Sequence, residues 1–349
     1  MNSAKNASKP AKLTPKMGLK HRNSFGLDCT AELAYEVTSA DQLPDLLNEI
    51  TSKQLPWRVL GGGSNVILPD SLPGASILIN IPGQEILASD EDATYLSVGA
   101  GVGWHELVAW TLEHDLPGLE NLALIPGTVG AAPIQNIGAY GVEIADVMHS
   151  LTAIDRLTGA RVELAAAACA FAYRDSLFKS RAPGRYIITK VRFLLSRKPT
   201  IRLDYGDIRR EIERLGIVQV TPRAVANAVI AIRQSKLPDP TKLGNAGSFF
   251  KNPVVPVTQA DELRQRFPGL VSYPQAVGVK LAAGWLIEQA GWKGRNQGAV
   301  GVHDRQALVL IHRGGGSGAQ LLQLAADVRA SVLDKFGVVL EQEPVIWGL

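Results

Sequence analysis

The segment Leu124–Gly141 carries no charged side chain and contains four glycines and two prolines. A solvated linker would be polar, and a strand of a hydrophobic core would not accept this many glycines and prolines. A buried loop whose backbone wraps a ligand fits both facts, because binding residues concentrate on loops that a rigid scaffold positions. The sequence therefore predicts a ligand-wrapping loop at this point in the chain.

Length and hydrophobic periodicity indicate several domains of mixed secondary structure. The 349 residues exceed what one hydrophobic core usually holds, so we expect two or three domains. Ser39 and Gln42 form a predicted capping box ahead of the first helix. Helical spacing of apolar residues predicts helices, and alternating or short continuous apolar runs predict strands. The predicted helices are 40–53, 103–115, 221–236, 278–290 and 318–336, and the predicted strands are 57–60, 66–68, 76–81, 94–99, 147–155, 185–195, 307–312 and 338–347.

Composition excludes several classes of protein. The 36 Lys and Arg residues are nearly balanced by 33 Asp and Glu residues, so no broad basic face for nucleic acid is expected. Cys29 and Cys169 lie far apart, without the spacing of a disulfide framework or a zinc site. No apolar run is long enough for a membrane span, and the N-terminus lacks the apolar core of a signal peptide. We expect a cytoplasmic protein without a metal, with residues 1–18 as a flexible basic tail.

Two further glycine-rich segments are candidates for phosphate binding. Gly61–Asn65 is not a P-loop, because no Lys-Ser/Thr pair follows at the required spacing, and Gly99–Gly103 lacks the third glycine of a dinucleotide fingerprint. Glycine-rich turns nevertheless present backbone N–H donors that can form a nest for an anion. Tight turns in a β-rich domain are the alternative interpretation.

Gly244–Pro253 places the Ser248 hydroxyl in a glycine turn, followed by Phe249 and Phe250. The glycines allow a ligand to approach the backbone, and the aromatic rings can exclude water beside the hydroxyl. A surface loop whose Ser and Asn satisfy turn geometry is the alternative.

Charged side chains in apolar surroundings are further candidates. Arg174 lies between aromatic residues, where a planar guanidinium can bind a carboxylate. Glu341 and Glu343 lie two apart on a predicted strand and so point the same way, with apolar flanks that favour the raised pKa of an acid or base. Solvated side chains are the alternative for all three. Arg233 and Lys236 place cations ahead of the Ser248 loop. The simpler explanation is that these cations stabilise the C-terminal end of the predicted helix 221–236.

Seven motifs occur in order along the chain: GGGSN (61–65), IPGTVGAAPIQNIGAYG (125–141), YRDSLFK (173–179), SKLPDP (235–240), GNAGSFFKNP (244–253), AAGWLIEQAGWKG (282–294) and LEQEP (340–344). Together they resemble the UDP-N-acetylenolpyruvoylglucosamine reductase family. The resemblance covers about residues 19 to 348. Tyr205 and the insertion 197–220 match the first of the two family types, in which a tyrosine loop closes over the diphosphate of the substrate.

The resemblance implies an α+β protein with a two-subdomain FAD-binding fold of the vanillyl-alcohol-oxidase (PCMH) type and a C-terminal α/β substrate-binding domain. The implied domains are 19–84 for FAD-binding subdomain 1, 85–226 for FAD-binding subdomain 2 and 227–337 for the substrate-binding domain. The C-terminal strand 338–349 could return to subdomain 1. The implied FAD contacts are Gly61, Gly62, Gly63, Ser64, Asn65, Pro126, Gly127, Gly130, Ala131, Gly138 and Arg233.

The family's reaction implies roles for further residues. NADPH reduces FAD, and flavin N5 then delivers hydride to the enolpyruvyl group of UDP-N-acetylenolpyruvoylglucosamine, which yields UDP-N-acetylmuramate for peptidoglycan synthesis. Ser248 matches the proton donor, while Arg174 and Glu343 match the residues that polarise the substrate carboxylate. Tyr205, Lys236 and Asn252 match residues that bind the nucleotide part of this small-molecule substrate. The resemblance implies no nucleic-acid or membrane partner, and we expect a monomer.

One departure and two alternatives remain. The family's C-terminal motif commonly continues as Glu-Val-Arg, whereas Glu343 here precedes Pro344 and Val345. Another FAD-dependent oxidoreductase of the same fold is one alternative, although 125–141 lacks the His or Cys that would attach a flavin covalently. A non-catalytic sugar-nucleotide binder is the other, although a binder would not need the proton donor Ser248.

Overall fold

The computed structural model describes residues 9–198, 200–205 and 207–348, and they form two compact units. Unit 1 holds the residues up to Met17 together with Ala31–Gly63 and Leu72–Arg233. Unit 2 holds Gly18–Thr30, Ser64–Ser71 and the chain from Gln234 onward. Each unit therefore combines segments that are distant in the sequence.

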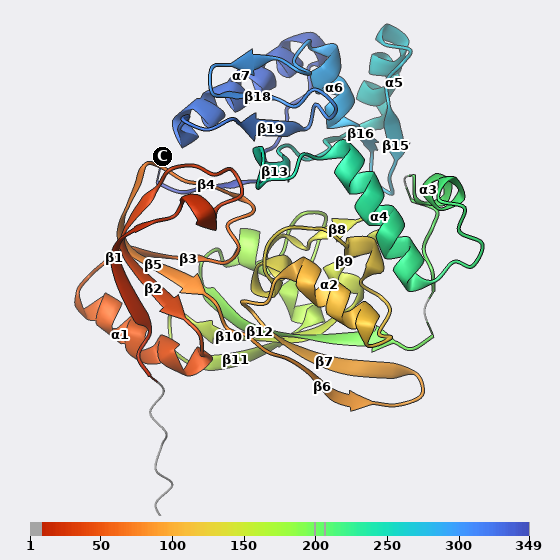
Figure 1. The fold of residues 1–349 in the computed structure, drawn as a ribbon. Coiled ribbons are helices and arrows are strands. Elements are labelled where there is room, and N and C mark those ends of the chain that lie inside the picture. Colours follow the sequence, from red (N-terminus) through yellow and green to blue (C-terminus); the bar gives the residue numbers. More distant parts are fainter. Residues whose placement is uncertain (1–8, 199, 206, 349) are drawn as a thin grey trace, which may run out of the picture. The chain divides into compact units, whose positions relative to one another are not determined.

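The first sheet of unit 1 has four strands in the order β1 (Lys12–Gly18), β2 (Thr30–Val37), β5 (Ser71–Ile79) and β3 (Trp57–Leu60). Helix α1 (Leu43–Ser52) follows the 3₁₀ turn η2 (Ala40–Gln42), and Ser39 and Gln42 form the predicted capping box. Figure 1 shows α1 lying beside this sheet. Its buried face, Leu43, Leu46, Leu47 and Ile50, packs on the sheet residues Ala75, Ile77 and Ile79 in one core.

The second sheet of unit 1 is antiparallel, in the order β11 (Arg161–Ala165), β10 (Met148–Asp155), β12 (Tyr186–Ser196), β7 (Ala93–Gly99) and β6 (Gln84–Ser89). Helices α2 (Trp104–Glu113) and α4 (Pro222–Lys236) share a core with it. The predicted alternation in β12 is confirmed, because Ile187, Thr189, Val191, Phe193 and Leu195 are all buried.

Short elements connect these layers in unit 1. Helix α3 is Ile208–Arg214, and the π turn η7 is Leu177–Arg181. The charge-free segment contains the 3₁₀ helix η4 (Val129–Gln135), which is followed by the hairpin β8 (Gly138–Ala139) and β9 (Val142–Glu143). The remaining 3₁₀ turns are η3 (Glu120–Leu122), η5 (Ile144–Asp146) and η6 (Ala166–Cys169).

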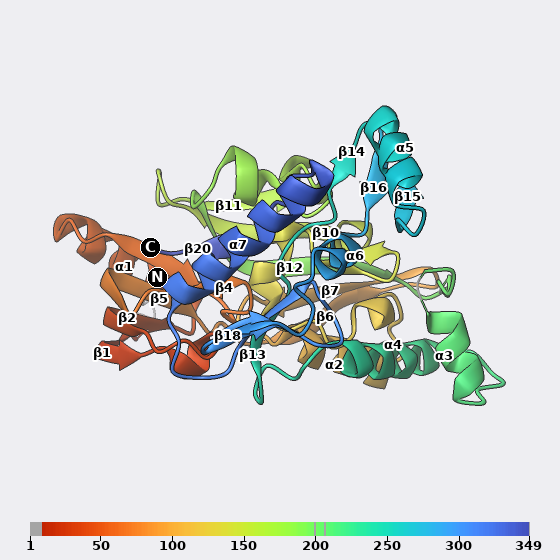
Figure 2. The same ribbon diagram turned by 90° about the horizontal axis from the view of Figure 1, so that it is seen from above.

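Unit 2 is built on the sheet β13 (Gly244–Ser248), β19 (Val309–His312), β18 (Val300–Val302) and β17 (Asn296–Gln297). Helix α7 (Gly318–Phe336), the long blue helix of Figure 2, begins at the capping box of Ser317 and ends at Gly337. A smaller sheet orders β14 (Val254–Val255), β16 (Val279–Leu281) and β15 (Ser272–Pro274), with α5 (Val257–Arg266) and α6 (Ala283–Gln289) alongside. The 3₁₀ turn η1 (Lys20–Arg22) also belongs to this unit, and β20 (Val345–Ile346) pairs in parallel with β4 (Val66–Ile67).

Three predictions of local structure are wrong. Residues 12–18 form β1 and are not part of a flexible tail, while 1–8 lie outside the described residues. Residues 279–281 form β16, so the predicted helix 278–290 begins only at Ala283. The predicted strand 338–347 is reduced to β20 and one bridge at Gln342, because Pro344 has no N–H to donate to a ladder.

The boundaries of the predicted domains, 19–84, 85–226 and 227–337, remain a proposal. Unit 1 contains predicted FAD-binding subdomain 2 and the parts 31–63 and 72–84 of predicted subdomain 1, whereas 19–30 and 64–71 group with unit 2. Its border with unit 2 falls after Arg233, not after residue 226. The C-terminal strand does return to a segment that was predicted in subdomain 1, but this segment, Val66–Ile67, groups with unit 2.

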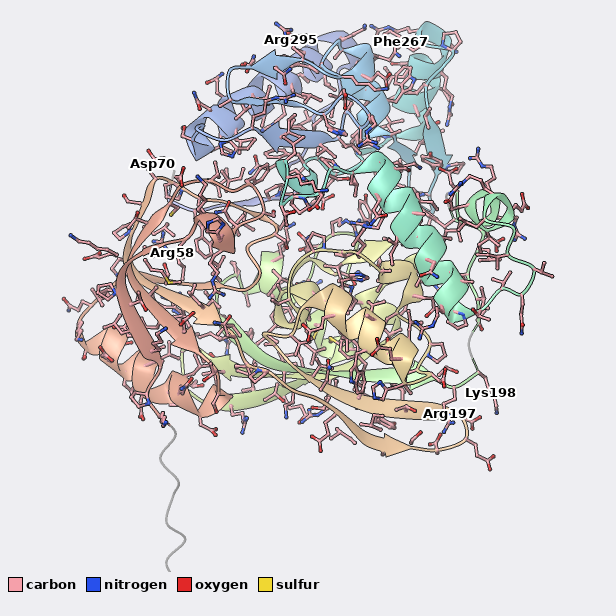
Figure 3. All side chains as sticks on the ribbon, viewed as in Figure 1. Arg58, Asp70, Arg197, Lys198, Phe267 and Arg295 are labelled. Atoms are coloured by element: carbon pink, nitrogen blue, oxygen red, sulfur yellow. The ribbon has the colours of Figure 1, made fainter. Side chains whose placement is uncertain are left out.

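The charged stretch after β12 is a solvated surface. Arg197 and Lys198, both labelled in Figure 3, contact the turn between β6 and β7, where Lys198 pairs with Asp92. Both partners of that pair are mostly exposed, so the pair contributes only about 0–1 kcal/mol to stability. Residues 199 and 206 of the predicted insertion 197–220 lie outside the described residues.

Candidate active site

The two glycine-rich segments of unit 1 lie directly against each other. A Cβ atom on Gly62 would lie 2.8 Å from Gly127 Cα, and one on Gly61 would lie 2.7 Å from Thr128 Oγ1. Side chains do not accept such distances to a backbone, so glycine is required at residue 62. The fold thus joins 61–63 and 127–128 into one structure, which we call the glycine cradle.

The third glycine-rich turn, Gly99–Gly103, is hydrogen-bonded to the chain that follows the cradle. The backbone N–H groups of Val129 and Gly130 donate to the carbonyls of Val102 and Ala100, both at 2.9 Å. A Cβ on Gly130 would lie 2.5 Å from Ala100 Cβ, which explains the need for glycine there as well. Gly99–Gly103 therefore acts as a structural turn that supports the cradle. This agrees with the alternative interpretation of the segment, a tight turn in a β-rich domain.

Among the glycine cradle and the predicted site residues of unit 1, two polar side-chain atoms are buried without a hydrogen-bond partner among the described residues. They are Thr128 Oγ1, in the cradle, and Arg233 Nε, near the end of α4. Burial lowers the pKa of the Arg233 guanidinium, with Tyr140 acting against this and Arg174 in the same direction. Buried polar groups normally have partners. A cation, a hydroxyl and close-packed glycines match the phosphates and carbonyls of a dinucleotide, so the residues of this unit fit FAD.

The turn around Gly138 is held in a strained conformation. Asn136 and Tyr140 have φ angles of 47° and 50°, which are unusual for residues other than glycine. The Asn136 amide stabilises the turn by donating to Glu143 Oε2 at 2.6 Å and to Ala172 O at 3.1 Å. Such strain is kept where the surrounding structure fixes it, commonly at binding sites.

Arg174 reaches this turn. Its Nη2 donates to Gly138 O at 2.8 Å, and its guanidinium lies 5.6 Å from the Tyr173 ring centre. Its own φ of 54° is imposed by a tight loop in which Ala172 and Asp175 exchange two backbone hydrogen bonds. The structure therefore brings the predicted carboxylate-binding residue together with the predicted cofactor contact Gly138.

The Cβ atom of Tyr205 lies beside the same turn, close to Gly141. A Cβ on Gly141 would lie 3.3 Å from Tyr205 Cβ, and the phenol ring is exposed. Arg202 anchors the segment by donating to Gly141 O at 2.8 Å. Asn121, which we did not predict, donates to both Tyr140 O and Arg202 O, so one buried amide fixes both segments.

In unit 2, Ser248 ends strand β13 at an irregular point of the sheet. The register with β19 shifts between Asn245 and Ser248, and Gly247 has a φ of 69°. The Asn245 side chain holds the bulge by accepting from Gly247 N at 2.9 Å. Phe249 and Phe250 are both 1% exposed, so the two aromatic residues that follow Ser248 in the chain are buried.

Glu343 and Glu341 occupy different environments. The backbone N–H of Glu343 donates to Phe249 O at 2.8 Å, and Asn65 Nδ2 donates to Glu343 O at 3.2 Å. Glu343 is buried, whereas the Glu341 side chain is 70% exposed and pairs with Lys251. The structure thus buries Glu343, but not Glu341. Glu343 is hydrogen-bonded to Phe249, the residue that follows Ser248.

The other predicted residues divide between the two units. Asn252 Oδ1 accepts from Ala283 N at 2.9 Å at the start of α6, and Lys236 is the last residue of α4. Unit 2 contains Ser64, Asn65, Lys236, Ser248, Asn252 and Glu343, and unit 1 contains Gly61, Gly62, Gly63, Pro126, Gly127, Gly130, Ala131, Gly138, Arg174, Tyr205 and Arg233.

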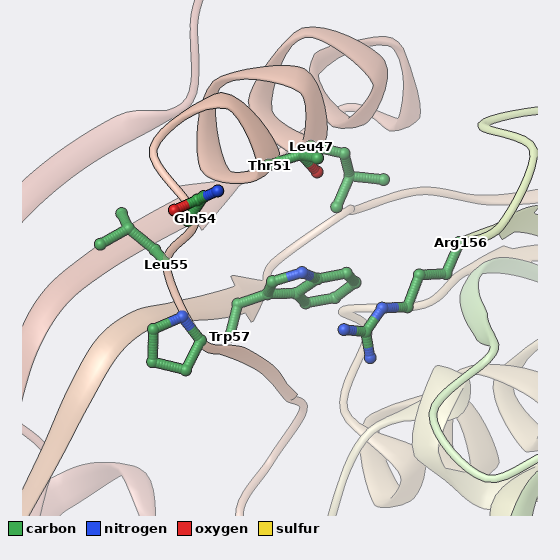
Figure 4. A pocket seen from close by; sticks show the side chains of 7 residues that line it. Leu47, Thr51, Gln54, Leu55, Trp57 and Arg156 are labelled. Carbon is green, nitrogen blue, oxygen red and sulfur yellow. The ribbon is translucent and has the colours of Figure 1, made fainter.

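A surface pocket elsewhere in unit 1 contains none of these residues. Figure 4 shows it beside α1, where the Arg156 guanidinium lies 4.1 Å from the centre of the Trp57 ring. Its lining has no carboxyl, imidazole or thiol group, so the cradle and the Ser248 loop are the better candidates for a catalytic site. The lining residues are Leu47, Thr51, Gln54, Leu55, Pro56, Trp57 and Arg156.

Other kinds of site find no support in the described part of the chain. It holds no cluster of three or more His, Cys, Asp or Glu residues suited to a metal ion. None of its helices combines the length and apolar character that crossing a membrane requires. Burial raises the pKa of the free Cys169 thiol to about 11, so this cysteine is not a nucleophile at neutral pH.

Comparisons with known proteins agree with the fold. Residues 31–165 match the model of an FAD binding domain, and 239–347 match that of the UDP-N-acetylenolpyruvoylglucosamine reductase C-terminal domain. This confirms the predicted α+β fold with an FAD-binding part followed by a substrate-binding part.

Full-length relatives carry the same family name. The UDP-N-acetylenolpyruvoylglucosamine reductase of Polynucleobacter asymbioticus is 54% identical over 99% of this chain and 100% of its own. That of Burkholderia ambifaria is 54% identical over 95% of this chain and 96% of its own. The solved structure of the Thermus caldophilus reductase aligns with a TM-score of 0.65 at 25% identity, covering 97% of this chain and 98% of that one. The chain therefore belongs to the UDP-N-acetylenolpyruvoylglucosamine reductase family.

Proposed function

We propose that the protein uses FAD and NADPH to reduce the enolpyruvyl group of UDP-N-acetylenolpyruvoylglucosamine to a lactyl ether, which gives UDP-N-acetylmuramate. The observation that carries the proposal is the identity of 54% over nearly the whole chain with a named reductase. The glycine cradle with its buried Thr128 Oγ1, and the buried Arg233 Nε of α4, support it independently.

The residues that would hold FAD are those of the cradle and its neighbours. Backbone N–H groups of 61–65, Gly127 and Thr128 would bind the pyrophosphate and ring carbonyls, Pro126, Gly130 and Ala131 would line the site, and Arg233 would supply a cation. Glycine lets the backbone approach the cofactor without a side chain between them. When bound, FAD accepts hydride from NADPH and supplies it to the substrate.

Arg174 and Glu343 would stabilise the substrate carboxylate. Hydride addition to the vinyl carbon moves negative charge onto the adjacent carbon and its carboxylate, so the residues around the carboxylate must stabilise more charge in the transition state than in the ground state. The planar Arg174 guanidinium suits a carboxylate, and Gly138 and Tyr173 hold it in place. The buried Glu343 would act as a protonated carboxyl that donates a hydrogen bond.

Ser248 would complete the reaction by donating its hydroxyl proton to the carbon next to the carboxylate. An alcohol is a weak acid, so this transfer works only because the acceptor is a strongly basic carbanion. The half-buried position of Ser248 beside two buried rings supports the role, since a dry surrounding strengthens a hydrogen bond to developing charge.

Tyr205, Lys236 and Asn252 would bind the nucleotide part of the substrate. The Asn252 oxygen is occupied by the Ala283 N–H, so its NH₂ group is the part that would donate to a uracil or phosphate oxygen. The exposed Tyr205 could reach a diphosphate after a loop movement. The same proposal includes a monomeric state and a cytoplasmic location, the latter in keeping with the free, buried Cys169.

The product identifies the reaction. Purified protein incubated with FAD, NADPH and the enolpyruvyl substrate should yield a sugar nucleotide heavier by two hydrogen atoms, as measured by mass spectrometry. NADPH consumption should depend on that substrate. Oxygen consumption at the same rate without the substrate would instead indicate an oxidase and contradict the proposal.

A further inference from the structure

The first two residues of α2 hold the chain that leads into the glycine cradle. Trp104 Nε1 donates to Leu122 O at 3.0 Å, and Trp104 N donates to Gly127 O at 2.9 Å. Between these two bonds, Leu124 N donates to His105 Nδ1 at 3.1 Å. Three hydrogen bonds from neighbouring residues therefore fix the path from Leu122 to Gly127.

The bond to His105 falls where the backbone is strained. Leu124 has a φ of 59°, in the left-handed region that leucine rarely adopts unless the surrounding structure holds it there. The next residues are Ile125 and Pro126, followed by Gly127 and Thr128 of the cradle. Releasing Leu124 would therefore change the direction in which the chain enters the cradle.

The hydrogen bond sets the protonation state of His105. Nδ1 can accept from Leu124 N only without a proton of its own, so the neutral ring carries its hydrogen on Nε2. A doubly protonated ring would place an N–H against an N–H. The bond therefore exists only in the neutral imidazole.

The surroundings of His105 favour the neutral form. Burial lowers the pKa of His105 below its ordinary 6.5, and the charge of Arg233 on α4 acts in the same direction. From η3, Glu120 is buried and its carboxylate accepts from Gly118 N at 2.6 Å. Helix η4 contributes no titratable side chain, and the neighbouring Glu106 is exposed.

We propose that neutral His105 is a positioning residue for FAD binding, because it holds Leu124 and so keeps Gly127 and Thr128 in the cofactor-binding arrangement. The inference rests on the proposed use of FAD. It assigns the role to a histidine that would itself not touch the reacting atoms.

The test measures FAD affinity of the apoprotein by flavin fluorescence between pH 8 and pH 5. For the wild type, the affinity for FAD should be constant above about pH 6.5, because His105 is then neutral both with and without FAD. Below the pKa that His105 has in the FAD-free protein, the affinity should fall by at most about tenfold per pH unit. His105→Asn places an amide oxygen where Nδ1 lies and does not titrate. It should bind FAD like the wild type at pH 8 and should lose the weakening at low pH. His105→Ala should bind about tenfold more weakly already at pH 8, because Leu124 N loses its partner.

A matched control lies directly after the end of the same helix. His114 follows α2, is exposed and stacks on Trp110, so His114→Asn should leave both the affinity and its pH dependence unchanged. Thermal unfolding of each apoprotein separates a folding defect from weaker binding, and if His105→Ala does not fold, His105→Asn decides alone. An Asn variant with the wild-type pH dependence, or a folded Ala variant with wild-type affinity, would overturn the inference. A wild type that binds no FAD at any pH would refute the proposed function itself.

Discussion

Ser248→Ala is expected to leave flavin reduction by NADPH within about twofold of the wild type and to slow reoxidation by the enolpyruvyl substrate by roughly 10²- to 10⁴-fold, the usual contribution of a general acid. The proton of Ser248 is needed only when the substrate carbon is protonated, so only the second half-reaction should respond. Stopped-flow absorbance of the flavin measures the two half-reactions separately.

The structure offers a control for the loss of a hydroxyl in the same unit. Ser272→Ala removes a partly buried hydroxyl that accepts from Arg264 and should leave both half-reactions near normal. Equal slowing of both half-reactions by Ser248→Ala would show that the loop shapes the cofactor site, and would contradict a role as proton donor.

Glu343→Gln is expected to slow the second half-reaction by roughly 10²- to 10³-fold, comparable to removal of one donor from an oxyanion hole. Glutamine conserves the volume of this buried side chain, but its N–H is a far weaker acid than a carboxyl O–H, so it stabilises the developing charge less. Flavin reduction by NADPH should change little.

Glu341→Gln is the matched comparison, two residues away. It removes only the exposed charge of Glu341, which pairs with Lys251, and should alter either half-reaction by less than about threefold. Similar losses in the two variants would mean that burial does not distinguish their roles, against the assignment of Glu343.

Local patterns predicted most elements but not all of their limits. The helices at α1, α2, α4 and α7 were predictable because each has an apolar stripe. Strand β1, Lys12–Gly18, was missed because its lysines and proline resemble a tail, although the same residues are typical of an edge strand, and β1 lies at the edge of its sheet. Residues 279–281 were assigned to a helix because three residues are too few to show the alternation of polar and apolar side chains that is typical of a strand. Their partner strands, β14 and β15, come from other parts of the sequence.

The candidate site divides in the same way. The glycine segments and Ser248 were recognisable as motifs, since each is dense in residues that only special backbone geometry explains. Asn121 and His105 were not, because each acts through a bond to another part of the chain, and a lone Asn or His carries no pattern. Glu341 and Glu343 looked equivalent on a predicted strand, and only their tertiary surroundings separate them.

The most direct test of the central claim is the flavin absorption spectrum of the purified protein with FAD, recorded without oxygen before and after two additions. NADPH should bleach the absorption of the oxidised flavin, and the enolpyruvyl substrate should then restore it. A protein that takes up no flavin, or a bleached flavin that this substrate does not reoxidise, would contradict the account.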